Sequence, residues 1–91
     1  MADNPSISVV IPVFNEEESL KKLYSELYDV LSPFINWEII FVDDGSDDNS
    51  YSVLKKMIDE ENRIVAIRFF KNFGKADALS EGFKYSMGDI I

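Results

Sequence analysis

The stretch from Glu38 to Ser50 reads EIIFVDDGSDDNS, and it decides the fold because a strand, a turn and a helix start follow one another within it. Residues 39–42 are all β-branched or aromatic, which predicts a buried strand. Gly45 then predicts a turn. Residues 46–49 are all of the types that cap helices, so we expect a helix to begin directly after them.

The same succession of strand and helix recurs on both sides of this stretch. Apolar runs predict strands, and apolar residues spaced three and four apart predict helices. This alternation predicts an α/β fold, a Rossmann-like three-layer parallel sheet with alternating helices and right-handed crossovers. We expect one domain over residues 1–91. The predicted strands are at 6–14, 37–42 and 63–70, and a fourth strand starts at 89–91. The predicted helices are at 15–31, 51–61 and 76–87, of which the first is ended by Ser32-Pro33 and the third by Gly88.

Polar segments follow each of the three predicted strands, at 12–18, 43–49 and 71–75. The carboxyl ends of parallel strands lie along one edge of the sheet, and ligands bind at that edge. We therefore expect these three segments to meet and to form the functional site.

Composition excludes several kinds of site. The chain has no cysteine and no histidine, which excludes disulfides, thiolate metal sites and any histidine-based catalytic pair. Its formal net charge of -8 argues against nucleic acid as a partner. No apolar run reaches the ~20 residues of a membrane span. No leader of the signal-peptide kind precedes the first strand, so the expected location is cytoplasmic.

Asp43 and Asp44 are the strongest candidates for a functional role. Two adjacent carboxylates repel each other unless a cation, donors of a ligand, or backbone amides stabilise them. Asp47, Asp48 and Asn49 are better explained as caps of the following helix. A calcium loop of the EF-hand kind is excluded, because Gly45 does not stand at the sixth position from a suitable aspartate.

Asn15 is expected to cap the first helix, and Glu16, Glu17 and Glu18 are expected in its first turn, where they complement the helix dipole. That explanation suffices for Glu17 and Glu18. Glu16 lies closest to the rim and is equally suited to contact a ligand.

Gly74 and Lys75 stand at the start of the third predicted helix. A glycine followed by a lysine at such a position can bind phosphate through backbone amides and the ammonium group. A Walker motif is excluded because Phe69 stands where that motif needs a glycine. For Lys71 and Lys75, two solvated charges are an equally good explanation.

Three blocks in this order, VVIPVFNEEESL, EIIFVDDGSDDNS and RFFKNFGKADALSEGFKYSMGDII, resemble the N-terminal part of family-2 glycosyltransferases with the GT-A fold. The resemblance runs from about Ser6 to Ile91. Within that family, the chain most resembles the branch that transfers sugars to polyprenyl phosphates, and it looks similar to dolichyl-phosphate mannose synthase.

The resemblance implies a nucleotide-binding role for a set of rim residues. Carboxylates accept hydrogen bonds from a base N–H or from ribose hydroxyls, which agrees with this role for the acids. Gly74 and Lys75 would lie near the base or the diphosphate. The implied nucleotide-binding residues are Pro12, Phe14, Glu16, Val42, Asp43, Asp44 and Lys75. An Asp44→Ala substitution is accordingly expected to abolish nucleotide binding and to leave the fold intact.

The resemblance also implies a metal that these residues do not bind. Family members carry an Asp-x-Asp motif that holds Mg²⁺ or Mn²⁺, and its expected position lies beyond Ile91. No catalytic residue and no metal ligand are predicted here, so we expect a piece of a longer enzyme that does not turn over alone. That enzyme would move a sugar, with inversion, from a nucleoside-diphosphate donor to an acceptor such as a polyprenyl phosphate, at the cytoplasmic face of a membrane.

Two alternatives stay open. One is a receiver-like α/β signalling module whose acidic pair binds Mg²⁺, although the segments after the first and third strands, PVFNE and RFFKN, disagree with that pattern. The other is an inactive structural fragment. A fourth strand that is cut short leaves an exposed sheet edge, through which a second copy could pair.

Overall fold

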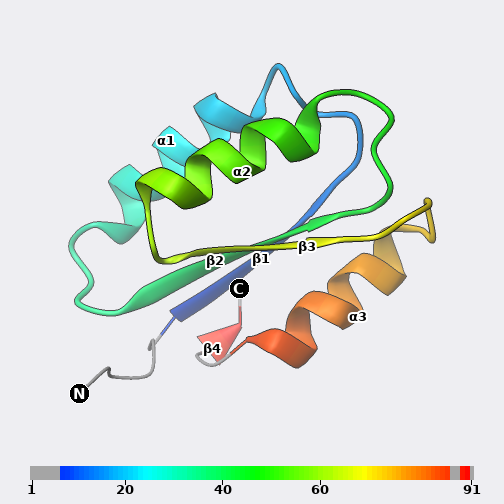
Figure 1. Cartoon of the computed structure of the whole chain (residues 1–91). Coiled ribbons are helices and arrows are strands. Elements are labelled where there is room, and N and C mark those ends of the chain that lie inside the picture. Colours follow the sequence, from blue (N-terminus) through cyan, green and yellow to red (C-terminus); the bar gives the residue numbers. More distant parts are fainter. Residues whose placement is uncertain (1–6, 87–88, 91) are drawn as a thin grey trace.

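The computed structural model describes residues 7–86 and 89–90, and it shows a parallel sheet with helices on both faces (Figure 1). The strands stand in the order β3-β2-β1-β4, and every pairing is parallel. The elements are β1 (Ile7–Val13), α1 (Leu20–Leu31), β2 (Trp37–Asp43), α2 (Ser50–Glu60), β3 (Ile64–Arg68), α3 (Lys75–Tyr85) and β4 (Asp89–Ile90). The predicted three-layer α/β fold is confirmed.

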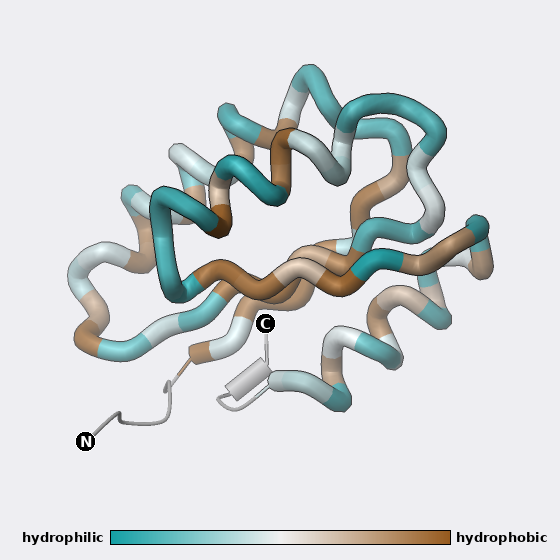
Figure 2. Tube along the Cα trace, in the orientation of Figure 1, coloured by the Kyte–Doolittle hydropathy of each residue, from teal (hydrophilic) through white to brown (hydrophobic). Residues whose placement is uncertain are grey.

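The central strand β2 is buried along its whole length. Its neighbours pair with it in parallel register, Val9 beside Ile39 on one side and Ala66 beside Phe41 on the other. A nearly continuous apolar run is typical of a parallel strand that is covered on both faces, because neither face can be polar. The hydropathy of the trace follows this arrangement, with apolar strands in the middle and polar loops outside (Figure 2).

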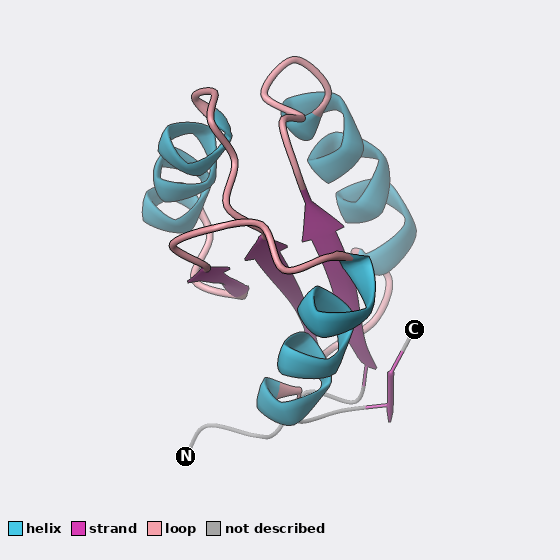
Figure 3. Cartoon of the chain, turned by 90° about the vertical axis from the view of Figure 1, so that its right-hand side faces the viewer, coloured by secondary structure: helices cyan, strands magenta, loops and turns pink. Residues whose placement is uncertain are grey.

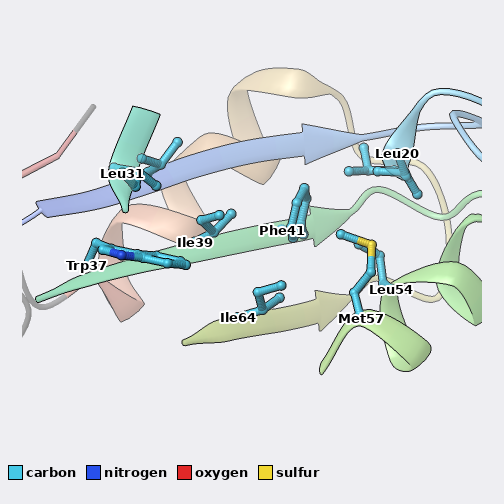
Figure 4. Packing of buried hydrophobic residues seen from close by; sticks show 10 residues of the cluster. Leu20, Leu31, Trp37, Ile39, Phe41, Leu54, Met57 and Ile64 are labelled. Carbon is cyan, nitrogen blue, oxygen red and sulfur yellow. The ribbon is translucent and has the colours of Figure 1, made fainter. Parts of the chain in front are cut away.

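Successive side chains of β2 enter two different cores. Ile39 and Phe41 belong to the larger core beneath α1 and α2, together with Trp37 and Leu54 (Figure 4). Ile40 and Val42 belong to the smaller core beneath α3. The alternation follows from strand geometry, in which neighbouring side chains point to opposite faces.

Helix α3 lies so close to the sheet that one of its positions has no room for a side chain. A Cβ atom on Gly82 would lie 2.3 Å from Cγ1 of Val10 and 3.2 Å from Cγ2 of Val42. The glycine therefore permits the close helix-to-sheet contact that carries the start of α3 to the rim.

The predicted start of the first helix is wrong. Helix α1 begins at Leu20, five residues after Asn15, and its N-cap residue is Ser19. No acidic residue lies in its first turn, so Glu16, Glu17 and Glu18 do not complement its dipole. The cause is tertiary: the main chain at Asn15 has a φ of 54°, and the Glu16 N–H donates to the Ser50 hydroxyl instead of entering a helix.

The other boundaries shift by fewer residues. Helix α2 begins at Ser50, and β3 covers only Ile64–Arg68 of the predicted strand. Helix α3 ends at Tyr85, with Ser86 as its C-cap, which is earlier than the predicted end at Met87. Ser6, Gly88 and Ile91 lie outside the described residues. Across the described part of the chain, the helices are too short or too polar to cross a bilayer.

Candidate functional site

The carboxyl ends of β1, β2 and β3 form one rim, which faces the viewer in Figure 3. Hydrogen bonds join the loops that follow these strands. The β1–α1 loop contacts the β2–α2 loop, where the Asn15 N–H donates to the Ser46 hydroxyl at 2.9 Å. The end of β2 contacts the β3–α3 loop through Asp44. The predicted meeting of segments 12–18, 43–49 and 71–75 is confirmed.

The Asp44 carboxylate holds the β3–α3 loop. It is only 3% exposed, and it accepts hydrogen bonds from the Phe73 N–H at 2.7 Å and the Gly74 N–H at 3.0 Å. The Asn72 side-chain amide donates to the same carboxylate at 3.1 Å. Of the three stabilisers left open by the sequence, backbone amides are the main one observed, assisted by a side-chain amide. A carboxylate has about four acceptor positions, so one remains, on Oδ1.

This arrangement has two consequences for the predicted site. The Phe73 and Gly74 amides donate to Asp44, so they are not free to cradle a phosphate at the start of α3. The Asp44→Ala substitution is also no longer expected to leave the fold intact, because it would leave three donors without their acceptor.

Gly45 brings the β2–α2 and β3–α3 loops together. Its φ is +72°, and a Cβ atom there would lie 2.3 Å from the Lys71 carbonyl carbon. The turn predicted at this glycine is thus also a point where two backbones touch, which only glycine permits.

Asp43 differs from Asp44 in having one oxygen without a donor. Its side chain is 0% exposed, and Oδ1 accepts a hydrogen bond from the Ser46 N–H at 3.1 Å. Among the residues described, none donates to Oδ2, although that oxygen is buried. A buried carboxylate oxygen without a donor is costly and rare, and a ligand that supplies the donor is one physical explanation.

Two further acids of the rim accept hydrogen bonds from serine residues. Asp48 accepts from the Ser50 hydroxyl and the Ser50 N–H, at the first residue of α2. The N-cap position itself is occupied by Asn49, whose side chain makes no capping hydrogen bond, so the predicted capping by Asp48 is not observed. The hydrogen bond from the Ser50 hydroxyl lowers the pKa of the Asp48 carboxyl. Glu16 is exposed and accepts a hydrogen bond from the Ser19 hydroxyl at 2.8 Å.

The other predicted residues occupy different depths in the rim. Phe14 is 43% exposed and Pro12 is half-buried. Val42 is fully buried, and its side chain packs in the smaller core beneath α3. Lys75 is exposed at the first residue of α3.

Two shallow hollows flank the rim. One has a volume of about 330 Å³ and an acidic lining that includes Glu16, Glu17 and Asp48. The other, of about 360 Å³, lies between the β2–α2 and β3–α3 loops and includes Arg68 and Phe70. Within residues 7–86 and 89–90, no three acidic, histidine or cysteine side chains are grouped so that they could hold a metal ion.

Two asparagines organise this rim in roles that were not predicted from the sequence. Asn15 joins two loops rather than capping a helix, and Asn72 donates to Asp44. Asn15 carried a usable signal, because asparagine adopts positive φ angles more readily than most residues. Asn72 had no comparable local signal, since its partner lies 28 residues away in the sequence.

Comparison with known proteins agrees with this fold. The family model described as glycosyl transferase family 2 matches residues 8–91. An undecaprenyl-phosphate 4-deoxy-4-formamido-L-arabinose transferase of Pectobacterium atrosepticum is 41% identical over 91 residues, which is 98% of this chain and 28% of that protein. A bactoprenol glucosyl transferase of Shigella phage SfX is 37% identical over 87 residues, covering 93% of this chain and 28% of its own length.

A solved structure is also similar in fold. The mannosyltransferase of Pyrobaculum calidifontis, in complex with GDP-mannose and Mn²⁺, superposes with a TM-score of 0.80 at 21% identity, over 92% of this chain and 25% of that chain. The chain thus spans about a quarter of the length of the relatives it matches. The family model covers nearly the whole chain. The chain belongs to glycosyl transferase family 2.

Proposed function

We propose that this rim binds the nucleotide of a nucleoside-diphosphate sugar. The observation that carries the proposal is the buried Oδ2 oxygen of Asp43, which none of the described residues supplies with a donor. It lies at the end of the central strand, where α/β sheets bind ligands. A base N–H or a ribose hydroxyl would supply the donor that this oxygen needs once the loop residues that cover it move aside, since Asp43 is 0% exposed.

The neighbouring residues suit the same ligand. Phe14 offers an exposed ring for a base, and the fourth acceptor position of Asp44 stays available. Glu16 offers an exposed carboxylate to the ribose, and Lys75 offers an ammonium group to the diphosphate. Pro12 and Val42 contribute through the backbone, because they lie near the strand ends from which Phe14 and Asp43 reach the rim.

The proposed reaction of the whole protein is transfer of the sugar, with inversion, to a polyprenyl phosphate. Support comes from the relatives whose names specify undecaprenyl-phosphate and bactoprenol. A phosphate oxygen of such an acceptor is already ionised at neutral pH, so attack on the sugar needs no strong base. The acceptor also implies work at a membrane surface.

A metal does not fit the residues described. Mn²⁺ accompanies GDP-mannose in the mannosyltransferase of similar fold, but the described acids of this rim do not converge on one point. Asp43 and Asp44 instead accept hydrogen bonds from three backbone amides in two loops. The same observation removes support from the receiver-like alternative, which needs an acidic Mg²⁺ site. Nothing in the proposed nucleotide binding is therefore routed through a metal.

The test is an amide NMR titration of the 91-residue chain with UDP and with GDP, each with and without Mg²⁺. We expect one nucleotide to shift resonances of Phe14, Asp43 and Lys75 whether or not metal is present. The Asp43→Asn variant keeps an acceptor for the Ser46 N–H but loses the second acceptor. It should weaken binding by about 10- to 150-fold, the equivalent of one lost hydrogen bond to a charged group.

Asp47→Asn is the matched control, because it makes the same chemical change on an exposed carboxylate of the same loop. Binding by Asp43→Asn at the affinity of this control would eliminate Asp43 as the nucleotide acceptor. Absence of any response from the unsubstituted chain would refute nucleotide binding by this rim on its own.

A further inference from the structure

Reciprocal hydrogen bonds centred on Asn15 join the β1–α1 loop to the β2–α2 loop. The Asn15 side-chain oxygen accepts from the Asp47 N–H at 2.8 Å and from the Asp48 N–H at 3.4 Å. In return, the Asn15 N–H donates to the Ser46 hydroxyl at 2.9 Å. We call this set of contacts the Asn15 clasp. It connects segments that lie 31 to 33 residues apart in the sequence.

Asparagine satisfies two requirements at this position at once. Its φ of 54° lies in the left-handed region, and Asn15 is the one non-glycine residue with a positive φ in the described part of the chain. Glycine would adopt this conformation easily but has no side-chain acceptor. Most other residues would be strained there, whereas asparagine tolerates it and also offers a carbonyl oxygen.

A second set of contacts extends the clasp into the protein. The Glu16 N–H donates to the buried hydroxyl of Ser50 at 2.9 Å, and that hydroxyl donates to Asp48. The Glu17 N–H is 3.4 Å from the other oxygen of Asp48. Together, the clasp and these contacts join three consecutive residues of the β1–α1 loop to the β2–α2 loop and to Ser50, the first residue of α2.

The place of the clasp in the rim gives it a function. Asn15 stands between Phe14 and Glu16, the two exposed residues that the proposed function assigns to the base and the ribose. We propose that Asn15 is a positioning residue, which holds the Phe14 and Glu16 side chains in one arrangement before the ligand arrives. The proposal rests on the proposed function for the identity of the ligand.

Energetics favour a positioning role over a role in global stability. The Asn15 contacts are exposed to solvent, so water competes for the same groups. Asn15 is not a member of the hydrophobic core beneath α1 and α2, which holds these helices on the sheet. Loss of the clasp is therefore expected to free a loop rather than to unfold the chain. A freed loop weakens binding because the ligand must then order it.

Two substitutions separate the roles of backbone and side chain. Asn15→Gly keeps the positive φ and removes the acceptor, whereas Asn15→Asp keeps both. The readouts are amide exchange with solvent, followed by NMR, and affinity for the nucleotide that binds the unsubstituted chain. In Asn15→Gly, we expect the Asp47 amide to exchange about two- to tenfold faster, the range for one net hydrogen bond. The melting temperature should stay close to that of the unsubstituted chain.

Nucleotide affinity should fall by a similar factor in Asn15→Gly and recover in Asn15→Asp. Asp47 exchange at the unsubstituted rate in Asn15→Gly would overturn the clasp. Faster exchange with unchanged nucleotide affinity would overturn the positioning role. If the unsubstituted chain binds neither UDP nor GDP, the proposed function fails, and so does the part of this proposal that concerns the ligand. The amide exchange rates still decide whether Asn15 joins the two loops.

Discussion

Replacing Asp44 by alanine tests whether this carboxylate is what attaches the β3–α3 loop to the sheet. The substitution removes the acceptor of three donors, the N–H groups of Phe73 and Gly74 and the side-chain amide of Asn72. Each hydrogen bond to a buried charged group contributes about 1.5–3 kcal/mol, but the donors belong to a partly exposed loop that water can reach after it moves. We therefore expect a net loss of about 3 kcal/mol rather than the full sum.

For a chain of this size the loss is large. A domain of 60–100 residues loses roughly 4–8 °C of melting temperature per kcal/mol, so Asp44→Ala should melt about 12–24 °C below the unsubstituted chain. The assay is thermal unfolding followed by circular dichroism, with amide exchange at Phe73 and Gly74 as a local readout. Asp47→Ala removes an exposed carboxylate three residues later and should change stability by less than about 0.5 kcal/mol.

The two readouts together decide the mechanism. A lower melting temperature with fast exchange at Phe73 and Gly74 is the expected result. An unchanged melting temperature with fast exchange would mean that the loop detaches locally and that its contact contributes little to global stability. Equal melting temperatures for Asp44→Ala and Asp47→Ala, with both amides still protected, would refute the reasoning.

Two further predictions concern the body of the fold. Gly82→Ala should lower the free energy of unfolding by about 1–3 kcal/mol, because the new methyl group overlaps Val10. Ser80→Ala, at an exposed position of the same helix, is the control and should be nearly neutral. Equal denaturation midpoints for the two variants would contradict this prediction. The hydrogen bond from Arg63 lowers the pKa of Glu61, so this pair stabilises the fold above about pH 4.5 and stops doing so as the pH falls through the lowered pKa. Glu61→Gln should lower the free energy of unfolding by about 0.5 kcal/mol at pH 7 and leave it unchanged at pH 2, as measured by urea titration at both pH values.

Much of the architecture followed from local patterns. The apolar run at 39–42 is continuous because β2 is covered on both faces, and that pattern identified the central strand correctly. The alternation of strands and helices identified the parallel sheet, and the direction of the strands then brought the three polar segments to one rim. The resemblance of the same blocks to family-2 glycosyltransferases is confirmed by the family model.

The loops of the rim could not be predicted in the same way. Asn15 followed by three glutamates looks like a capped helix start, and local preferences favour that structure. The main chain instead turns at Asn15, because its side chain and the Glu16 N–H find partners in the β2–α2 loop and at the start of α2. Asp44 likewise contacts amides of the β3–α3 loop, which no pattern around Asp44 could reveal.

The sequence by itself therefore determined the order of the elements, the parallel sheet and the edge at which the polar segments meet, because periodicity and turn residues act over short distances along the chain. Only the tertiary structure decided where α1 begins, which carboxylate holds a loop and which keeps an acceptor free. Those outcomes depend on hydrogen bonds between segments 28 to 34 residues apart, whose partners become neighbours only after the strands have paired.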